Sequence, residues 1–452
     1  MNSKIFSYFF SVIMLLSMIS CEKNIQIDPP SSLDGSAGFK SKQDVEAALL
    51  GCYNSMQSAN YVGLRYWALC DMYADNIAHV GTFPTFAQVA NKGILADNAE
   101  VNNMWLNIYS GINRMNTVID AAGAVDDKSF NNAAAIAEAK LLRAFQYFNL
   151  LRFFGGSETG YNKSGGLGVP IILKPTLTSK EALPVARSSE ADVWKQIVED
   201  IDFAVANLPN STATGRVNKR VAFALKARAH LYREEWAQAE AASDSVIVKG
   251  GYSLLPSANY ATVFFQKGNS ETIWELVYDP TNTSQSYFFF YPTSLGGRNE
   301  ISATTTLRDA SEANDVRKAV NYTTTPAAKT LKFTRSDGTD NNIMIRLAEM
   351  YFIRAEARAK LNKITESLAD VNVIRKRAGI TDAAATTEAT LLTAIEKERR
   401  IELAFEGHRW FDIRRYNKLA SVNITQTFRA LWPIPQREVL TSNNVIAQNP
   451  SY

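Results

Sequence analysis

Residues 225–247 read LKARAHLYREEWAQAEAASDSVI, and residues 353–375 read IRAEARAKLNKITESLADVNVIR. Both stretches show the same pattern: a helix with two small residues on one face, a short polar turn, and a second helix with another small residue. Small side chains at helical spacing let two antiparallel helices pack closely. The two stretches therefore predict two helical hairpins of one kind. The small residues concerned are Ala227, Ala229 and Ala241 in the first copy, and Ala355, Ala357 and Ala369 in the second.

Helical patterns continue along the chain on the N-terminal side of these copies. Residues 44–57 and 104–121 are amphipathic, residues 138–154 are apolar on almost every side, and residues 189–207 form a further pattern that ends before Pro209. The two copies are not separated by the 34 or so residues of a regular tetratricopeptide array. The predicted fold class is therefore mainly α: tetratricopeptide-like helix pairs in a superhelical scaffold, with long loop and short-strand insertions.

Two stretches between the helices are irregular. One covers residues 79–98, and the other runs from about 250 to 342 and contains two apolar runs, 272–278 and 287–292, that favour strands. If residues 287–291 (YFFFY) are extended, alternate side chains face outward. Loops held by a rigid scaffold are where binding residues are usually found, so these insertions are the candidate binding segments.

The N-terminus has the pattern of an export signal. Lys4 precedes an apolar run over residues 5–19, which ends in the sequence MISC at Cys21. This pattern predicts a lipoprotein signal peptide at residues 1–20, lipidation of Cys21, and a lipidated tether at residues 21–40. A plain secretory signal with an incidental cysteine is the alternative. After Cys21, no segment reaches about 18 consecutive apolar residues, so no membrane span is predicted there.

Charge and motif content argue against several classes of function. Lys and Arg total 48 and Asp and Glu total 45, a formal charge of +3, so nucleic acid is not an expected partner. The three histidines, His79, His230 and His408, stand in no zinc-binding or nucleophile motif, and no phosphate-binding loop is present. We expect no catalytic residues, no metal and no cofactor. His230 and His408 are expected to pack or hydrogen-bond, whereas His79, in an irregular stretch, is open to ligand contact.

Three glutamates, Glu398, Glu402 and Glu406, follow one another at helical i, i+4 spacing beside apolar residues. Unpaired, they would repel one another, and a carboxylate on an apolar face needs a cation or backbone donors. The sequence therefore predicts a paired structural network rather than acid–base catalysis. The nearby candidates for the cations are Arg346, Arg354, Arg375, Arg399, Arg409, Arg414 and Arg415.

Two cysteines remain in the body of the chain, Cys52 and Cys70. Each lies among apolar neighbours on a predicted helix, where a free thiol behaves as a small hydrophobic group. A disulfide between them is the alternative in an oxidising compartment.

Several motifs taken together resemble the SusD/RagB family of outer-membrane nutrient-binding lipoproteins. The longest is ERRIELAFEGHRWFD at residues 398–412. The others are Trp105 with Tyr109, Ile112, Asn113 and Asn116; EAKLLRAF at 138–145; residues 220–232 followed by Trp236; RLAEMY at 346–351; IRKRAG at 374–379; WPIP at 432–435; and QNPSY at 448–452. The resemblance runs from Cys21 to Tyr452.

This resemblance implies one SusD-like domain over residues 41–452, with an N-terminal part to about 250, an insertion at about 250–342 and a C-terminal part at about 343–452. It implies a lipid-anchored protein on the cell surface at the outer membrane. It also implies a partner, a SusC-like TonB-dependent outer-membrane barrel. In such pairs the lipoprotein captures a nutrient, most often an oligosaccharide, and delivers it to the transporter.

Aromatic residues flanked by polar side chains mark the expected ligand site, because sugar rings stack on aromatic rings while their hydroxyls form hydrogen bonds. One aromatic stretch runs from residue 61 to residue 86, and the other covers residues 287–299. The predicted ligand-binding residues are Phe83, Asp75, Tyr287, Tyr291 and Arg298. The alternative for each aromatic residue is core packing.

Two alternatives to glycan binding remain at this point. The same architecture suits oligopeptides, as in the RagB branch, because apolar peptide side chains would also bind to aromatic surfaces. A different class of function is an assembly adaptor that uses its helix pairs to dock a protein and binds no small ligand.

Overall fold

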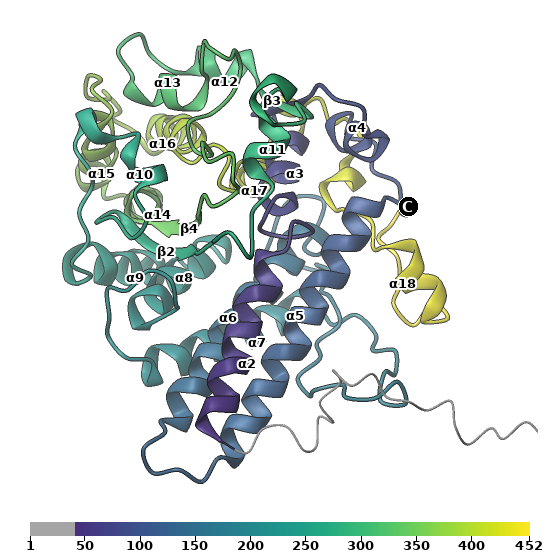
Figure 1. Cartoon of the computed structure of the whole chain (residues 1–452). Helices are drawn as coiled ribbons and strands as arrows, with labels where there is room; N and C mark the ends of the chain where they lie inside the picture. Colours follow the sequence, from purple (N-terminus) through teal and green to yellow (C-terminus); the bar gives the residue numbers. More distant parts are fainter. Residues whose placement is uncertain (1–40) are drawn as a thin grey trace, which may run out of the picture. The chain divides into compact units, whose positions relative to one another are not determined.

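Antiparallel helices make up most of the molecule (Figure 1). The computed structural model describes residues 41–452. The predicted signal peptide, the lipidation site Cys21 and the tether lie outside the described residues. The mainly helical fold class predicted from the sequence is confirmed.

The N-terminal helices lie close to their predicted positions. They are α2 (Lys42–Gln57), α5 (Ala99–Ala124), α6 (Asn132–Phe154) and α7 (Glu190–Asn207). Ser41 begins α2 with a capping box, and Ser189 caps α7. Helix α6 is buried on nearly all sides between α5 and α7, as its apolar sequence predicts.

The two similar stretches form two helical hairpins. The first is α8 (Lys219–Tyr232) with α9 (Trp236–Lys249), and the second is α14 (Leu347–Lys360) with α15 (Ile364–Arg377). Helix α9 also packs against α14, so the two hairpins stack directly on each other although about a hundred residues separate them.

The small residues of the first helices pack as predicted, and those of the second helices do not. Ala227, Ala229, Ala355 and Ala357 are buried. Ala241 and Ala369 are exposed, so their predicted packing role is wrong. The helix–helix contact instead uses Ala239, Ala242 and Ser243 in α9, and Ser367 in α15, whose hydroxyl donates to the carbonyl of Ala355 at 2.7 Å.

The insertions contain short elements rather than a further layer of helices. Strand β2 (Thr272–Leu276) confirms the strand predicted there and pairs antiparallel with β4 (Asn342–Arg346). The strand predicted at residues 287–292 is wrong, because that run forms the short helix α11 (Ser286–Phe290).

The remaining elements, inside and outside the insertions, are α3 (Arg65–Tyr73), β1 (Ile77–His79), α4 (Pro84–Ala90), η2 (Ser257–Asn259), α10 (Thr262–Phe265), η3 (Thr293–Leu295), β3 (Ile301–Ala303), α12 (Thr305–Ala310), α13 (Val316–Asn321), α16 (Glu388–Glu402), α17 (Arg409–Arg415), η4 (Leu419–Val422), η5 (Thr427–Ala430) and α18 (Gln436–Thr441).

The glutamates of α16 and of the turn that follows it form a buried ionic network, as predicted. Glu402 accepts hydrogen bonds from Arg346, Arg377 and Arg317. Arg317 also bonds to Glu398 at 2.7 Å. Arg317 comes from the insertion and Arg377 from α15, and neither was among the expected cations. Burial opposes ionisation, but these guanidinium groups hold the pKa of Glu402 well below its ordinary value.

We predict that this network makes the fold sensitive to acid. The pKa values of Glu402, Glu406 and Asp412 are lowered in the folded state, so each carboxylate stabilises the fold above its unfolded pKa of about 4 and loses this contribution as the pH falls below it. Burial raises the pKa of Asp71 to about 7, so the contribution of this group to stability falls as the pH rises from about 4 to 7. Urea unfolding between pH 3 and 9 is expected to show a stability maximum near about pH 5, with a loss of several kcal/mol by pH 3. Unchanged stability down to pH 3 would contradict this.

Cys52 and Cys70 are both free and buried, which confirms the apolar reading of the two residues. Burial raises the pKa of the Cys52 thiol to about 12, so this thiol is unreactive in the folded protein. Within residues 41–452, no helix is both long and apolar enough to cross a bilayer.

Candidate functional site

The two predicted binding stretches meet in space through one small pair of strands. Strand β1 pairs antiparallel with β3, with His79 opposite Ile301 and Ile77 opposite Ala303. The loop that follows β1 and the turn that precedes β3 therefore emerge at the same end of this two-stranded ribbon. Phe83 lies in the first segment and Arg298 in the second, so the structure brings these two predicted residues together.

The buried carboxylate of Glu300 ties the two segments to each other. Its Oε1 accepts a hydrogen bond from the backbone N–H of Phe83 at 2.6 Å and lies 2.9 Å from Nε2 of His79. Its Oε2 accepts from Nε of Arg298 at 3.0 Å. Burial opposes ionisation of Glu300, yet these donors hold its pKa below the ordinary value. The carboxylate therefore fixes the positions of all three groups.

Gly81 allows the loop to approach this carboxylate. The backbone N–H groups of Val80 and Gly81 donate to the carbonyl of Glu300 at 3.0 and 3.1 Å. A Cβ atom on residue 81 would lie only 2.3–2.5 Å from the carboxylate atoms of Glu300. Only glycine lets the backbone pass so close to this side chain without displacing it.

Arg298 lies flat against an aromatic ring and keeps part of its hydrogen-bonding capacity. Its guanidinium carbon is 4.0 Å from the centroid of the Phe83 ring, a cation–π contact. The side chain is 38% exposed, and neither terminal nitrogen has a hydrogen-bond partner among residues 41–452. Because five N–H groups are available and only Nε–H is used, the guanidinium can donate to a ligand.

Phe288 adds an exposed ring from a residue whose backbone is bonded to that of Arg298. It is 40% exposed, and its backbone carbonyl accepts from the N–H of Arg298 at 2.6 Å. Val80, also exposed, lies at the start of the loop. We call this region the Phe83–Arg298 surface, formed by His79, Val80, Phe83, Phe288 and Arg298. It combines exposed apolar groups with directed donors, the combination that binds a ring bearing hydroxyl groups.

The prediction that Tyr287 and Tyr291 face outward is wrong. In helix α11, positions i and i+4 share one face, and the two rings stack on each other with centroids 4.2 Å apart. They are only 7% and 6% exposed. Their hydroxyls donate to the carbonyls of Leu295 at 2.8 Å and Thr330 at 2.9 Å. Both tyrosines belong to the core, and Phe288 is the member of this run that reaches solvent.

Asp75 does not join the Phe83–Arg298 surface either. It precedes β1, at the end of the ribbon opposite Phe83, and its carboxylate accepts from Arg409 at 2.8 and 3.2 Å and pairs with Arg400 at 3.2 Å. Burial opposes ionisation, but these arginines lower the pKa of Asp75. Asp75 lines a separate hollow.

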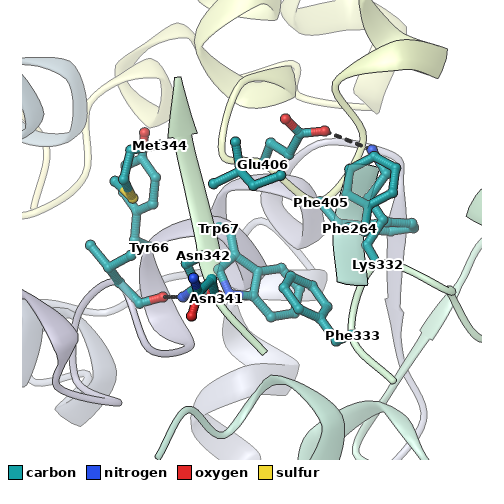
Figure 2. A pocket seen from close by; sticks show the side chains of 12 residues that line it. Tyr66, Trp67, Phe264, Lys332, Phe333, Asn341, Asn342, Met344, Phe405 and Glu406 are labelled. Atoms are coloured by element: carbon teal, nitrogen blue, oxygen red, sulfur yellow. Dashed lines mark hydrogen bonds and ion pairs between the residues drawn. The ribbon is translucent and has the colours of Figure 1, made fainter. Parts of the chain in front are cut away.

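Other aromatic residues of the first predicted stretch belong to the core. Trp67 is 2% exposed and stacks on Phe290 and Phe333, with centroids 5.7 and 4.6 Å apart. Figure 2 shows Trp67 with Tyr66, Phe333 and Asn341 around a small internal cavity. Its volume of about 20 Å³ suffices for one water molecule and is far too small for a sugar ring.

His230 and His408 fit the packing and hydrogen-bonding roles expected of them. His230 Nδ1 contacts Glu235 at 2.5 Å, and burial holds the pKa of His408 well below its ordinary value, so both residues are part of the packed structure. His79 is half-buried beside Glu300. Across the described part of the chain, no group of three or more His, Cys, Asp or Glu residues is arranged to hold a metal ion.

Sequence reasoning did not single out Glu300 or Phe288 as candidate site residues. Phe288 stood within a recognised aromatic run, but its exposure depends on α11 being helical. Glu300 lies next to Arg298-Asn299, and no local pattern shows that it organises a loop more than 200 residues earlier in the chain. Only the pairing of β1 with β3 reveals that role.

Comparisons with known proteins agree with this architecture. The model of the SusD family matches residues 260–428, and a second model, described as "Starch-binding associating with outer membrane", matches residues 26–231. A SusD-like protein of Formosa agariphila is 26% identical, over 98% of each chain.

Solved structures extend this likeness to the fold. A SusD superfamily protein from Bacteroides thetaiotaomicron superposes with a TM-score of 0.77 at 26% identity, covering 91% of this chain and 100% of that one. A laminarin-binding SusD-like protein has a TM-score of 0.77 at 23% identity, covering 92% and 100%. With two family models matching successive parts of the sequence, this chain belongs to the SusD family.

Proposed function

We propose that this protein is a cell-surface lipoprotein that captures an oligosaccharide at the Phe83–Arg298 surface. The proposal rests on one observation: the half-buried ring of Phe83 lies against a guanidinium whose orientation is fixed by the buried carboxylate of Glu300, and the exposed Phe288 is bonded through its backbone to that arginine. The C–H face of a sugar ring would stack on the phenyl rings, while its hydroxyls would accept hydrogen bonds from Arg298. No step of this binding alters the glycan.

The comparisons support a carbohydrate as the ligand. One matching family model is described as starch-binding, and one structural neighbour is a laminarin-binding protein. A neutral glucan is therefore the first ligand to test. The description of the same family model also names association with the outer membrane.

The remaining parts of the proposal concern anchoring and delivery. Cys21 would carry the lipid, the segment to residue 40 would act as the tether, and a SusC-like TonB-dependent barrel would accept the captured oligosaccharide. Affinity purification of the full-length protein from its native membrane tests this part. A barrel protein is expected to co-purify, and mass spectrometry should find acylated Cys21 as the first residue.

Replacing Phe288 by alanine is expected to weaken binding of a laminarin-derived oligosaccharide about tenfold, because the stacking area is lost. The thermal unfolding temperature should hardly change, since the side chain is largely in solvent. Titration calorimetry on the full-length protein in detergent would measure the affinity. Phe265→Ala is the matched control, because Phe265 is similarly exposed, at 37%, but lies in α10.

A glycan array read beside a peptide pull-down separates this proposal from its alternatives. Tight peptide capture without any glycan signal would replace the sugar by an oligopeptide. Barrel co-purification with no soluble ligand of either kind would identify an assembly adaptor. Shortening of the oligosaccharide during the titration would show that the protein is an enzyme.

A further inference from the structure

A hollow of about 550 Å³ lies beside Asp75, at the end of β1 opposite the Phe83–Arg298 surface. Five separate segments meet there: the link before β1, the end of α4, the start of α12, the C-terminal half of α16, and η4. We call it the Arg400 pocket. Its lining residues are Ala74, Asp75, Ala90, Asn91, Lys92, Thr306, Arg400, Ser421, Val422 and Asn423.

Arg400 is held rigidly at this pocket with donor capacity to spare. Its Nε donates to the side chain of Asn76 at 3.0 Å, and its Nη2 donates to the hydroxyl of Thr306 at 3.0 Å and to the carbonyl of Asp75 at 3.2 Å. Its Nη1 has no hydrogen-bond partner between residues 41 and 452. A guanidinium fixed in this way is pre-organised to bind a carboxylate or sulfate oxygen.

Lys92 contributes a second cation with no acidic partner. Its Nζ donates to the carbonyls of Met72 at 2.8 Å and Ala74 at 2.9 Å, and no carboxylate of the described chain lies within 4.0 Å of it. Burial lowers its pKa to about 8, even with Asp75 nearby. Such a partly desolvated ammonium gains from an anion placed beside it.

The surroundings of the pocket carry a surplus of positive charge. Arg429 donates to the carbonyl of Lys92 at 2.8 Å and also lacks a carboxylate within 4.0 Å in the part of the chain described. The acid at the pocket, Asp75, is already shared between Arg400 and Arg409. The whole chain is close to neutral, so this local excess is a property of the site.

The rest of the lining suits a polyhydroxylated ligand. Asn91, Ser421 and Asn423 are exposed and offer amide or hydroxyl groups around the two cations. The volume of about 550 Å³ is within the range of small-molecule sites and larger than a simple inorganic anion requires.

We propose that the Arg400 pocket binds an acidic sugar residue, with its carboxylate or sulfate group placed between Arg400 and Lys92. This extends the proposed function, because it adds an acidic unit to the glycans that the protein captures. We expect the pocket to prefer an anionic sugar over a neutral one because of the positive charges of Arg400, Lys92 and the neighbouring Arg429.

Titration of the full-length protein in detergent at low ionic strength tests the proposal with four probes: glucuronate, glucose 6-sulfate, glucose and inorganic sulfate. At least one acidic sugar is expected to bind ten times more tightly than glucose. The comparison of glucuronate with glucose 6-sulfate identifies the preferred anion. Inorganic sulfate is expected to bind more weakly than the preferred sugar, because it cannot use the polar rim.

Two variants test the location of the site. Ser421→Asp places a negative charge at the exposed rim, and Lys92→Met removes a cation. Each should weaken binding of the preferred acidic sugar at least fivefold. Ser179→Asp, a change of the same kind at an exposed serine outside the pocket, should have no effect. Because Ser421 is exposed, its variant tests the site even if Lys92→Met fails to fold.

Three results would overturn the inference: equal affinity for glucose and both acidic sugars, tighter binding of inorganic sulfate than of either sugar, or equal affinities of the Ser421→Asp and Ser179→Asp variants. Phe288→Ala separates the two sites. It should leave binding of the acidic monosaccharide intact. If the protein fails to bind the neutral oligosaccharide, that result therefore contradicts the proposed function and not the inference about the Arg400 pocket.

Discussion

Replacing Glu402 by glutamine is expected to lower the free energy of unfolding by about 3–5 kcal/mol. Glu402 is fully buried and lies among Arg317, Arg346 and Arg377. Glutamine keeps the volume but removes the charge, and its amide N–H₂ group would point at guanidinium donors. Three buried cations would then share fewer carboxylates, and an uncompensated buried charge is among the costliest defects in a protein interior.

The expected loss exceeds that from an ordinary surface charge because of the links that Glu402 makes between elements. Arg346 ends β4, Arg377 ends α15 and Arg317 lies in α13, so one carboxylate joins three parts of the chain to α16. Urea unfolding followed by circular dichroism measures the change. Glu366→Gln serves as the control, since Glu366 is exposed on α15 and should shift the stability by less than about 0.5 kcal/mol. Equal stability of both variants would show that Glu402 is dispensable.

Replacing Glu300 by alanine is expected to reduce oligosaccharide affinity by about 30-fold, equivalent to about 2 kcal/mol. Its carboxylate holds the N–H of Phe83, the imidazole of His79 and the guanidinium of Arg298. Once these donors lose their common acceptor, Arg298 is free to leave the Phe83 ring, and binding must then pay to order it again. The stability should also fall, by about 1–3 kcal/mol, because the N–H of Phe83 loses its buried acceptor.

Titration calorimetry with a laminarin-derived oligosaccharide would measure this effect, with Glu366→Ala as the control. Arg298→Ala isolates the contribution of the guanidinium, because Phe83 and His79 keep their contacts with Glu300 in that variant. Two outcomes would count against the proposed site. One is unchanged affinity in Glu300→Ala at lowered stability, and the other is unchanged affinity in Arg298→Ala.

The limits of sequence reasoning are clearest in the run YFFFY at residues 287–291. Five consecutive aromatic residues have no periodicity, so the pattern does not distinguish a strand from a helix. The helix forms where the run packs beneath the loop after β1, with Tyr287 and Tyr291 turned inward and Phe288 outward. Phe83 and Arg298 were both predicted as ligand-binding residues, which stays a prediction, but nothing local indicated that they touch each other.

Asp75 shows that residues close in sequence need not share a site. It was expected beside Phe83 because the two lie near each other in the sequence. The three residues of β1 and the loop behind them separate Asp75 from that surface and place it with Arg400 and Arg409, more than 300 residues later. The acidic helix was more predictable, since buried glutamates require cations wherever these come from.

By itself, the sequence determined the helical hairpins, the buried character of α6 and the need for cations around Glu398, Glu402 and Glu406. These properties follow from side-chain periodicity and the cost of burying charge, which act over a few residues. The tertiary structure alone decided which aromatic rings reach solvent, which of them meet Arg298, and which cations gather at the Arg400 pocket. Each of these depends on contacts between segments hundreds of residues apart, and no local pattern encodes such contacts.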